Sequence, residues 1–233
     1  MKAKSANLAE SRKKVVTRKR AKPAPKASVQ RLPRAERQAR VLAKAAEYFS
    51  EYGLTVQTRA IADACGISQR LLYRLFPSKA ALLEEVYQRE IAGGFKAVWF
   101  VQLKDRSRSL QERLNAFYCD YYDSVLTRRW LRLFLYASLA EYRMAPNYTD
   151  SVVAHSLEII MEEVAHTTGL PLPADAHRTA EIGWQLHGAV SHLAIRRHIY
   201  FNENPTPPHE VIAMHVQAFL NSVPLLLQAA VLA

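Results

Sequence analysis

Residues 58–76 constrain the possible folds most strongly, because they predict two short helices joined by a tight turn. Ala62 and Gly66 lie four residues apart, and their small size would let two crossing helices approach closely. Ser68 is suited to cap the second helix, and Pro77 ends it because proline disfavours helical geometry in the residue before it. The two helices are expected at residues 58–64 and 68–76, on either side of Cys65-Gly66-Ile67.

The outer side of the second helix is predicted to carry polar and basic side chains. The 3.6-residue period turns Leu72 and Phe76 inward, where Ile61 and Ile67 complete an apolar wedge. Arginine can donate two hydrogen bonds to guanine, glutamine can pair with the adenine edge, and a tyrosine hydroxyl suits phosphate oxygens. The pattern predicts a helix-turn-helix that enters the major groove of DNA and presents Gln69, Arg70, Tyr73 and Arg74.

The chain after residue 34 is predicted to be helical throughout. Long stretches rich in Ala, Leu, Glu, Arg and Gln are unbroken by Pro or Gly, and no segment alternates polar and apolar residues. Further helices are expected at residues 34–52, 78–104 with a bend at Gly93-Gly94, 109–127, 129–144, 149–168, 174–201 and 207–231. The predicted fold class is therefore all-α, with about nine helices.

Positive charge is concentrated at the N-terminus. Residues 1–34 contain twelve lysines and arginines and one acidic residue, Glu10, whereas the remainder of the chain is balanced. Residues 1–33 have few large apolar side chains and are predicted to form a disordered basic arm. Such an arm could attract DNA or enter a minor groove, as homeodomain arms do. Alternatively, it is a solubilising tail or a segment upstream of the true start codon.

A set of residues around the two short helices occurs with a fixed spacing: Ala45-Ala46-Glu47-Tyr48-Phe49, Gly53, Ile61-Ala62, Cys65-Gly66-Ile67-Ser68, Leu72-Tyr73, Phe76-Pro77-Ser78-Lys79 and Leu82-Leu83. This pattern resembles the N-terminal signature of the TetR family of helix-turn-helix transcriptional regulators. The resemblance implies a DNA-binding domain, expected at residues 34–80, and a helical ligand-binding and dimerisation domain at residues 81–233. It also implies a homodimer formed by the last two long helices.

Carried over position by position, the resemblance implies a set of DNA contacts. Tyr73 and Lys79 would contact phosphates, and Thr58 would be another backbone contact. Leu71 stands where the family usually has threonine, and it would touch a thymine methyl group instead of a phosphate. The predicted DNA-binding residues are Thr58, Ser68, Gln69, Arg70, Leu71, Tyr73, Arg74 and Lys79.

The chain beyond residue 95 carries many large apolar side chains that could line a cavity. An apolar cavity with a few polar groups is the usual form of a small-molecule site. The candidate ligand-binding residues are Phe117, Tyr121, Phe134, Met161, Trp184, His187 and Ser191. For each of these aromatic residues, and for His187, a place in the ordinary core or in an interface is the alternative. The predicted function is a repressor that an unidentified small molecule releases from DNA.

The last two predicted helices are rich in Leu, Val, Ala and Ile and suit a four-helix dimer seam, although they could instead close an intramolecular core. Close helix approach would be allowed by Gly183, Gly188, Ala189 and Ala194. The homodimer is favoured because helix-turn-helix proteins gain affinity by binding an operator with two half-sites. No run of 18 apolar residues and no secretory signal occurs, so a cytoplasmic protein without a membrane partner is expected.

Two other functional classes fit the sequence less well. An architectural DNA-binding protein, or an activator without an inducer, would also use the basic arm. A helical metalloenzyme would need two Glu-x-x-His motifs and further glutamates, and only Glu163 and His166 have that spacing. Cys65 and Cys119 have neither metal-ligand nor disulfide spacing, and Cys65 is expected to be a small buried apolar residue. No catalytic residue, metal ligand or cofactor is predicted.

Overall fold

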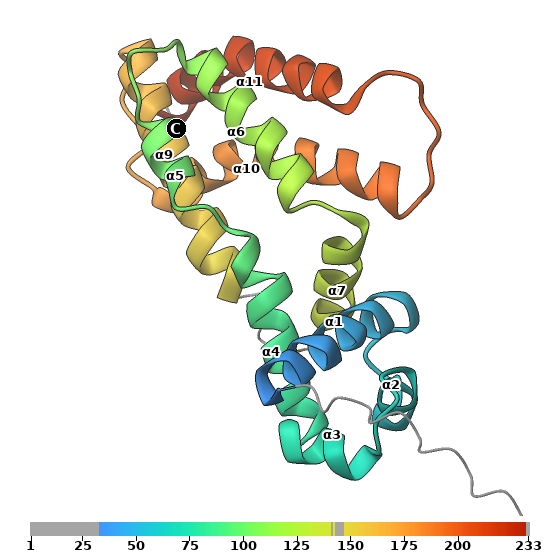
Figure 1. Cartoon of the computed structure of the whole chain (residues 1–233). Coiled ribbons are helices and arrows are strands. Elements are labelled where there is room, and N and C mark those ends of the chain that lie inside the picture. The colour runs from blue at the N-terminus through green and yellow to red at the C-terminus, as the bar shows by residue number, and fades with distance from the viewer. Residues whose placement is uncertain (1–32, 141, 143–146, 232–233) are drawn as a thin grey trace, which may run out of the picture. The chain divides into compact units, whose positions relative to one another are not determined.

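The computed structural model describes residues 33–140, 142 and 147–231, so the predicted basic arm lies outside the described residues except for Pro33. The described residues are helical and contain no strand, as the sequence predicts (Figure 1). In chain order the elements are α1 (Arg34–Tyr52), α2 (Thr58–Ala64), α3 (Gln69–Leu75), α4 (Lys79–Glu90), the 3-10 turn η1 (Ala92–Gly94), α5 (Val98–Leu103), α6 (Leu110–Ser124), α7 (Arg128–Leu139), the π-helical segment η2 (Thr149–Val153), α9 (Ala154–Thr168), α10 (Ala176–His198) and α11 (Pro208–Val231).

Helices α1, α2 and α3 pack around one apolar wedge. Phe49 of α1, Ile61 of α2 and Leu72 of α3 are fully buried, and α4 packs against α1 beside them. The Ser68 hydroxyl accepts a hydrogen bond of 3.2 Å from the Leu71 amide and so caps α3. Cys65 is buried at the turn, as expected. The buried residues of α3 are thereby held against α1 and α2, and the remaining residues of α3 lie on its outward side.

Gly66 is required by its backbone conformation. Its φ is +66°, which side chains other than glycine rarely adopt, and its amide donates a hydrogen bond to the Asp63 carbonyl. A Cβ atom placed on Gly66 would meet nothing within 4 Å. The prediction that Gly66 is small so that α2 and α3 can approach each other is therefore wrong. Ala62, by contrast, is fully buried.

Replacing Gly66 with alanine is expected to lower the free energy of unfolding by about 1–2 kcal/mol. In the left-handed backbone conformation of this position, the Cβ atom of alanine lies too close to the following carbonyl oxygen. Asparagine tolerates this conformation better, so Gly66→Asn should cost less than Gly66→Ala. Urea denaturation followed by circular dichroism would measure both variants at one protein concentration. Equal losses in the two variants would contradict a conformational origin.

The helix predicted for residues 78–104 is broken rather than bent. It consists of α4, the turn η1 and α5, and Phe95 between them has extended backbone. Two adjacent glycines, Gly93 and Gly94, each weaken a helix by about 1 kcal/mol relative to alanine. The break also places the Trp99 indole, whose N–H donates a hydrogen bond of 2.7 Å to Asp120 of α6.

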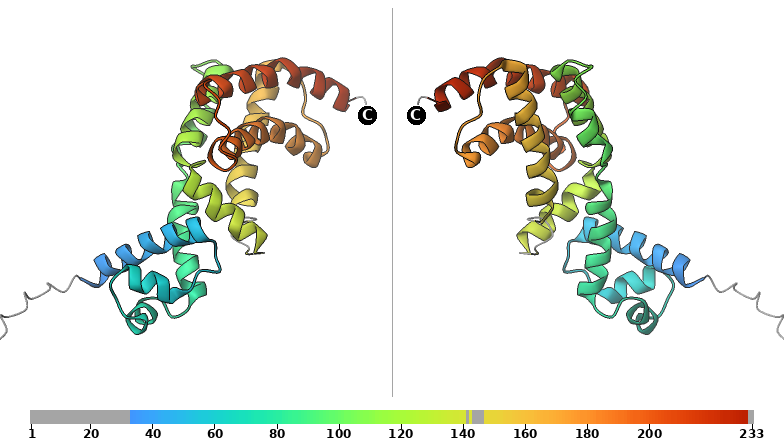
Figure 2. Two further views of the ribbon diagram at one scale, coloured as in Figure 1. Left: turned by 90° about the vertical axis from the view of Figure 1, so that its right-hand side faces the viewer. Right: turned by 90° about the vertical axis from the view of Figure 1, so that its left-hand side faces the viewer.

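The remaining helices pack as a bundle in which α10 contacts α9 and α11, and α11 also contacts α6 (Figure 2). Gly183 of α10 faces α9, where an added Cβ would lie 3.3 Å from the Leu157 Cβ. Gly183 was expected to allow close helix approach in a dimer seam. It instead allows α10 to approach α9 within the chain. Gly188 has open space around it.

Helix α11 has an inner and an outer side. Its inner side is buried through Ile212, Val216 and Val223, among others. Its outer side exposes Met214, at 62%, and Leu225, at 68%. By length and composition alone, Pro208–Ala229 is apolar enough to cross a membrane, with 28% of the window buried, so the expectation of no such candidate is wrong. Because α11 packs on α6 and α10, we interpret it as a bundle helix with an uncovered apolar side.

Candidate functional site

Helix α3 presents the four predicted side chains outward. Gln69, Arg70, Tyr73 and Arg74 are all exposed, whereas Leu72 and Leu75 on the opposite side are buried. Tyr73 keeps 40% of its surface accessible although it packs against α2. The helix therefore offers a continuous polar and basic surface on a rigid apolar support.

Thr58, at the start of α2, contacts two side chains of the α3 surface. Its hydroxyl lies 2.9 Å from the Tyr73 hydroxyl and accepts a hydrogen bond of 3.2 Å from the Gln69 side-chain amide. Thr58 is itself buried. The sequence suggested a direct DNA contact for Thr58, whereas its observed bonds hold two α3 side chains in place.

The other predicted contact residues lie at the two ends of α3. Ser68 is exposed and caps α3, and Leu71 is half-buried. Lys79 begins α4 and is also half-buried, and this burial lowers the pKa of its ammonium group although Tyr73 opposes the shift. Sequence reasoning did not single out Arg59, which is exposed in the first turn of α2 beside Thr58.

A cavity of about 160 Å³ lies among α6, α7, η2 and α10. Five of the predicted ligand-binding residues line it: Tyr121, Phe134, Trp184, His187 and Ser191. Sequence reasoning missed Trp130 and Tyr148, whose rings approach each other at 5.3 Å between centroids. Trp130 also stacks on Phe134 at 4.7 Å. Aromatic rings therefore form part of the cavity wall, beside aliphatic side chains.

The wall of this cavity is uncharged near neutral pH. No Asp, Glu, Lys or Arg lines it among the described residues. Burial lowers the pKa of His187 to about 4, so its imidazole is neutral. Burial, with the neighbouring Tyr148 hydroxyl, raises the pKa of Tyr121 well above its usual value. The buried polar atoms of the lining residues that have no hydrogen-bond partner include Trp130 Nε1 and His187 Nδ1.

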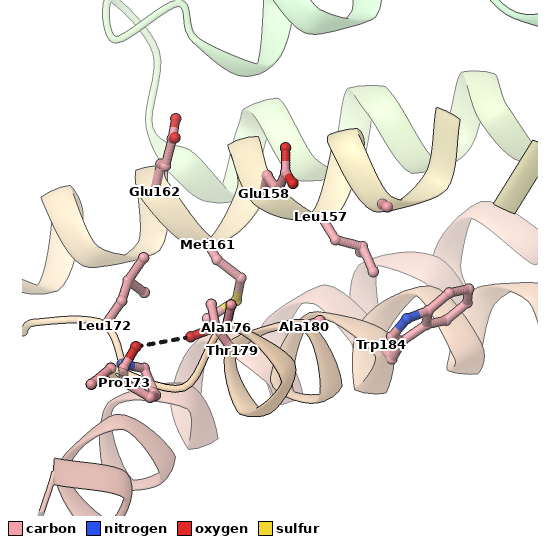
Figure 3. A pocket seen from close by; sticks show the side chains of 12 residues that line it. Leu157, Glu158, Met161, Glu162, Leu172, Pro173, Ala176, Thr179, Ala180 and Trp184 are labelled. Carbon is pink, nitrogen blue, oxygen red and sulfur yellow. Dashed lines mark hydrogen bonds between the residues drawn. The ribbon is translucent and has the colours of Figure 1, made fainter. Parts of the chain in front are cut away.

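A second cavity, of about 310 Å³, lies between α9 and the first turns of α10 (Figure 3). Met161, predicted as a ligand-binding residue, lines this second cavity and not the first. Trp184 lines both. Phe117 lines neither and is buried, with its ring stacked on Tyr121 at 5.7 Å between centroids.

Comparison with known proteins addresses the helix-turn-helix directly. Residues 41–86 match the family model described as bacterial regulatory proteins, tetR family. Residues 41–86 are therefore similar to the N-terminal region of TetR-family regulators. This match supports a DNA-binding transcriptional regulator with a helix-turn-helix, as the sequence predicts.

Solved structures of TetR-type proteins share the fold. A TetR-like transcriptional regulator from Rhodococcus sp. RHA1 has 22% identity and a TM-score of 0.59, over 84% of this chain and 99% of that chain. A TetR-family regulator from Mesorhizobium loti has 15% identity and a TM-score of 0.59, over 82% and 98%. AmtR from Mycobacterium smegmatis has 22% identity and a TM-score of 0.57, over 83% and 88%. No curated protein sequence matches the chain.

Helix α7 connects the first cavity to the helix-turn-helix. Trp130 and Phe134 line the cavity, whereas Arg132 donates hydrogen bonds to the Ser50 and Glu51 carbonyls at the end of α1. Arg128 pairs with the Glu51 carboxylate. Tyr136 covers Gly53, where an added Cβ would lie 3.6 Å from its ring. A displacement of α7 would therefore act on α1 directly.

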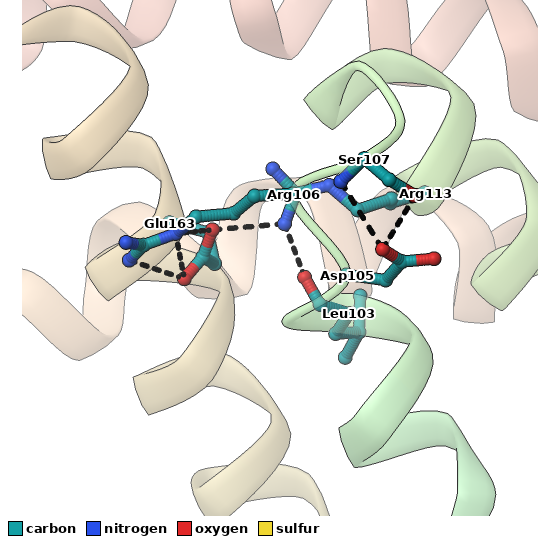
Figure 4. A network of polar contacts seen from close by, with 6 residues as sticks. All are labelled: Leu103, Asp105, Arg106, Ser107, Arg113 and Glu163. Atoms are coloured by element: carbon teal, nitrogen blue, oxygen red, sulfur yellow. Dashed lines mark hydrogen bonds and ion pairs between the residues drawn. The ribbon is translucent and has the colours of Figure 1, made fainter.

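Glu163, which the sequence marked as half of a single Glu-x-x-His, is held by two arginines (Figure 4). Arg106 Nη2 lies 2.9 Å from Glu163 Oε1, and Arg113 Nη1 lies 2.8 Å from Glu163 Oε2. Arg113 also donates to the Leu103 carbonyl. Within the described ranges, no group of three His, Cys, Asp or Glu side chains is placed to hold a metal ion. The network fastens the loop after α5 to α9.

Proposed function

We propose that this protein is a homodimeric repressor that leaves its operator when a small molecule binds the C-terminal domain. Residues 34–80 form the DNA-binding domain in this proposal, and residues 81–233 form the ligand-binding and dimerisation domain. The observation that carries it is the exposed α3 surface, backed by buried leucines and ordered by Thr58. The protein acts in the cytoplasm, where operator DNA is accessible.

The proposed roles divide the predicted contact residues into those that face bases or phosphates, those that bind phosphates, and one that positions the others. Gln69, Arg70 and Arg74 face bases or phosphates, whereas Tyr73 and Lys79 bind phosphates and fix the register. Ser68 and Leu71 contribute at the helix start, with Leu71 placed against a thymine methyl group. Thr58 acts through Tyr73 and Gln69 and is therefore a positioning residue.

Ligand release follows from two populations of the dimer. In one, the two α3 helices are spaced for adjacent half-sites about 34–36 Å apart. A ligand in the cavity shifts α7, and the Arg132 and Arg128 contacts carry the shift to α1 and to α4 beside it. A coupling of about 1–3 kcal/mol would change DNA affinity roughly 5- to 150-fold.

Replacing Arg70 with alanine is expected to lower operator affinity by about 1–3 kcal/mol, because an arginine that pairs with guanine discriminates by that amount. DNA selected from a random pool by the purified full-length protein would supply the operator, and fluorescence anisotropy would measure affinity. Arg89→Ala is the matched control, since Arg89 is exposed on α4 away from α3. An Arg70 variant that binds operator as the unaltered protein does would contradict the proposed surface.

The second candidate function is an architectural DNA-binding protein, which the basic composition of residues 1–34 favours. A regulator should bind operator at least about 10³-fold more tightly than random DNA. An architectural protein would show little such gap and a steep dependence on salt. The same anisotropy titrations, repeated on random DNA and at several salt concentrations, separate the two functions.

A further inference from the structure

The first cavity has room for one six-membered ring. Its volume is about 160 Å³, and an apolar cavity of about 150 Å³ in another protein holds a single benzene molecule. Sites for drug-sized ligands usually measure about 300–1,000 Å³. Tyr121, Leu131 and Val153 in its wall are buried, and closely packed interiors do not expand readily. The volume therefore limits the occupant to a molecule of single-ring size.

The accessible wall of this cavity is almost wholly apolar. Leu126, Phe134 and Ile195 are among the residues that line it. The unpartnered polar atoms Trp130 Nε1 and His187 Nδ1 have almost no accessible surface, so they face packed protein and not the cavity. A polar group on an occupant would therefore lose its hydrogen bonds to water and find few partners in the wall.

The cavity also disfavours charge. None of its described lining residues carries a formal charge near neutral pH, so an ionised ligand would lose its hydration without gaining an ionic partner. A hydrocarbon has no hydrogen bonds to lose and is favoured by leaving water. We infer that the first cavity binds an uncharged hydrocarbon of single-ring size, selected by volume and by apolar contact. This inference rests on the proposed function and specifies the ligand class for it.

Trp184 limits the length of the hydrocarbon. It lines both the first cavity and the 310 Å³ cavity between α9 and α10. Trp184 is half-buried, and its ring packs edge-on against His187 at 5.2 Å between centroids. Because the indole belongs to the walls of both cavities, replacing it with alanine should enlarge the first cavity toward the second and make room for another ring.

Three single-ring probes test the ligand class by titration calorimetry on the full-length protein without DNA. Toluene should bind at least about tenfold more tightly than phenol, which has a similar shape but would bury a hydroxyl group with few partners. Benzoate should bind more weakly than phenol, because it would bury a charge. Toluene that binds no more tightly than phenol or benzoate overturns the ligand class, even if the protein binds operator normally.

A matched pair of variants on α10 tests the location. Ser191 lines the first cavity and Ala180 lines the second, and both are half-buried. Ser191→Phe should fill the first cavity and abolish toluene binding, whereas Ala180→Phe should leave the toluene affinity unchanged. Circular dichroism would check that both variants are folded. Toluene that still binds folded Ser191→Phe at the unaltered affinity overturns the assignment to the first cavity.

A fourth probe, naphthalene, tests the size limit and the role of Trp184. It should bind Trp184→Ala at least about tenfold more tightly than the unaltered protein, and such a gain cannot come from a loss of folding. Naphthalene that binds both proteins equally overturns the role of Trp184. Toluene binding as expected, with no change in operator affinity by anisotropy, contradicts ligand release and leaves the ligand class supported.

Discussion

Replacing Glu163 with alanine is expected to lower the free energy of unfolding by about 3–5 kcal/mol, because it leaves a buried charge without its partner. The Arg113 and Glu163 side chains are 3% and 5% exposed and lie 2.8 Å apart. Without the carboxylate, the Leu103 carbonyl is the acceptor that still holds Arg113. A buried guanidinium cannot lose its proton, so the protein must unfold locally or hydrate the site.

Urea denaturation of full-length variants at one protein concentration measures this loss. Glu162→Ala is a matched control, because Glu162 is the exposed neighbour on α9 and should change stability by no more than about 0.5 kcal/mol. Glu163→Gln retains an acceptor but not the charge, so it should fall between the two alanine variants. A Glu163→Ala loss no larger than that of Glu162→Ala would show that the arginine network does not stabilise the fold.

The stabilisation by Glu163 also depends on pH in a defined direction. Hydrogen bonds from Arg106, and then from Arg113, lower the pKa of the Glu163 carboxyl below its ordinary value of 4.5. Such a group stabilises the folded state above pH 4.5, and this stabilisation is lost as the pH falls through the lowered value. The stability gap between the unaltered protein and Glu163→Gln should therefore be full at pH 7 and shrink below pH 4.5.

The helix-turn-helix was predictable because its signals are local in the sequence. Gly53 ends α1, Ser68 caps α3 and Pro77 follows it, and α1 and α2 have the predicted bounds. The outward side of α3 follows from the helical period once Leu72 is assigned to the core. The role of Thr58 was not predictable, because its bonds to Tyr73 and Gln69 depend on how α2 and α3 cross.

The lining residues of the cavity were only partly predictable from the sequence. The helical period indicates which side of a helix is buried, but not which other helices it packs against. Tyr121 and His187 were found as inward aromatic and polar residues of long helices. Met161 shares that character, but α9 turns it toward the first turns of α10 and into the second cavity. Tyr148, before η2, enters the first cavity through packing between segments distant in sequence. Composition alone does not determine such a contact.

Replacing both Met214 and Leu225 with aspartate is expected to separate the proposed dimer and to lower operator affinity by about 10²–10⁴-fold. Both side chains are exposed apolar residues of α11, and Ala218 and Asn221 between them are also exposed. The four positions recur at helical spacing, so they form one outward stripe that suits a second copy of the chain. Losing the second half-site removes an avidity of that size.

Light scattering after size exclusion would then give the chain mass of 26.4 kDa for the Met214 and Leu225 variant and twice that mass for the unaltered protein. Val101→Asp with Leu139→Asp is the matched control, because these residues are 69% and 83% exposed on α5 and α7. The control should remain dimeric and bind operator normally, since neither residue lies on α11. If the variant with aspartate at positions 214 and 225 remained a dimer, the exposed side of α11 would not be the dimer interface. Binding of two half-sites would then depend on a different interface.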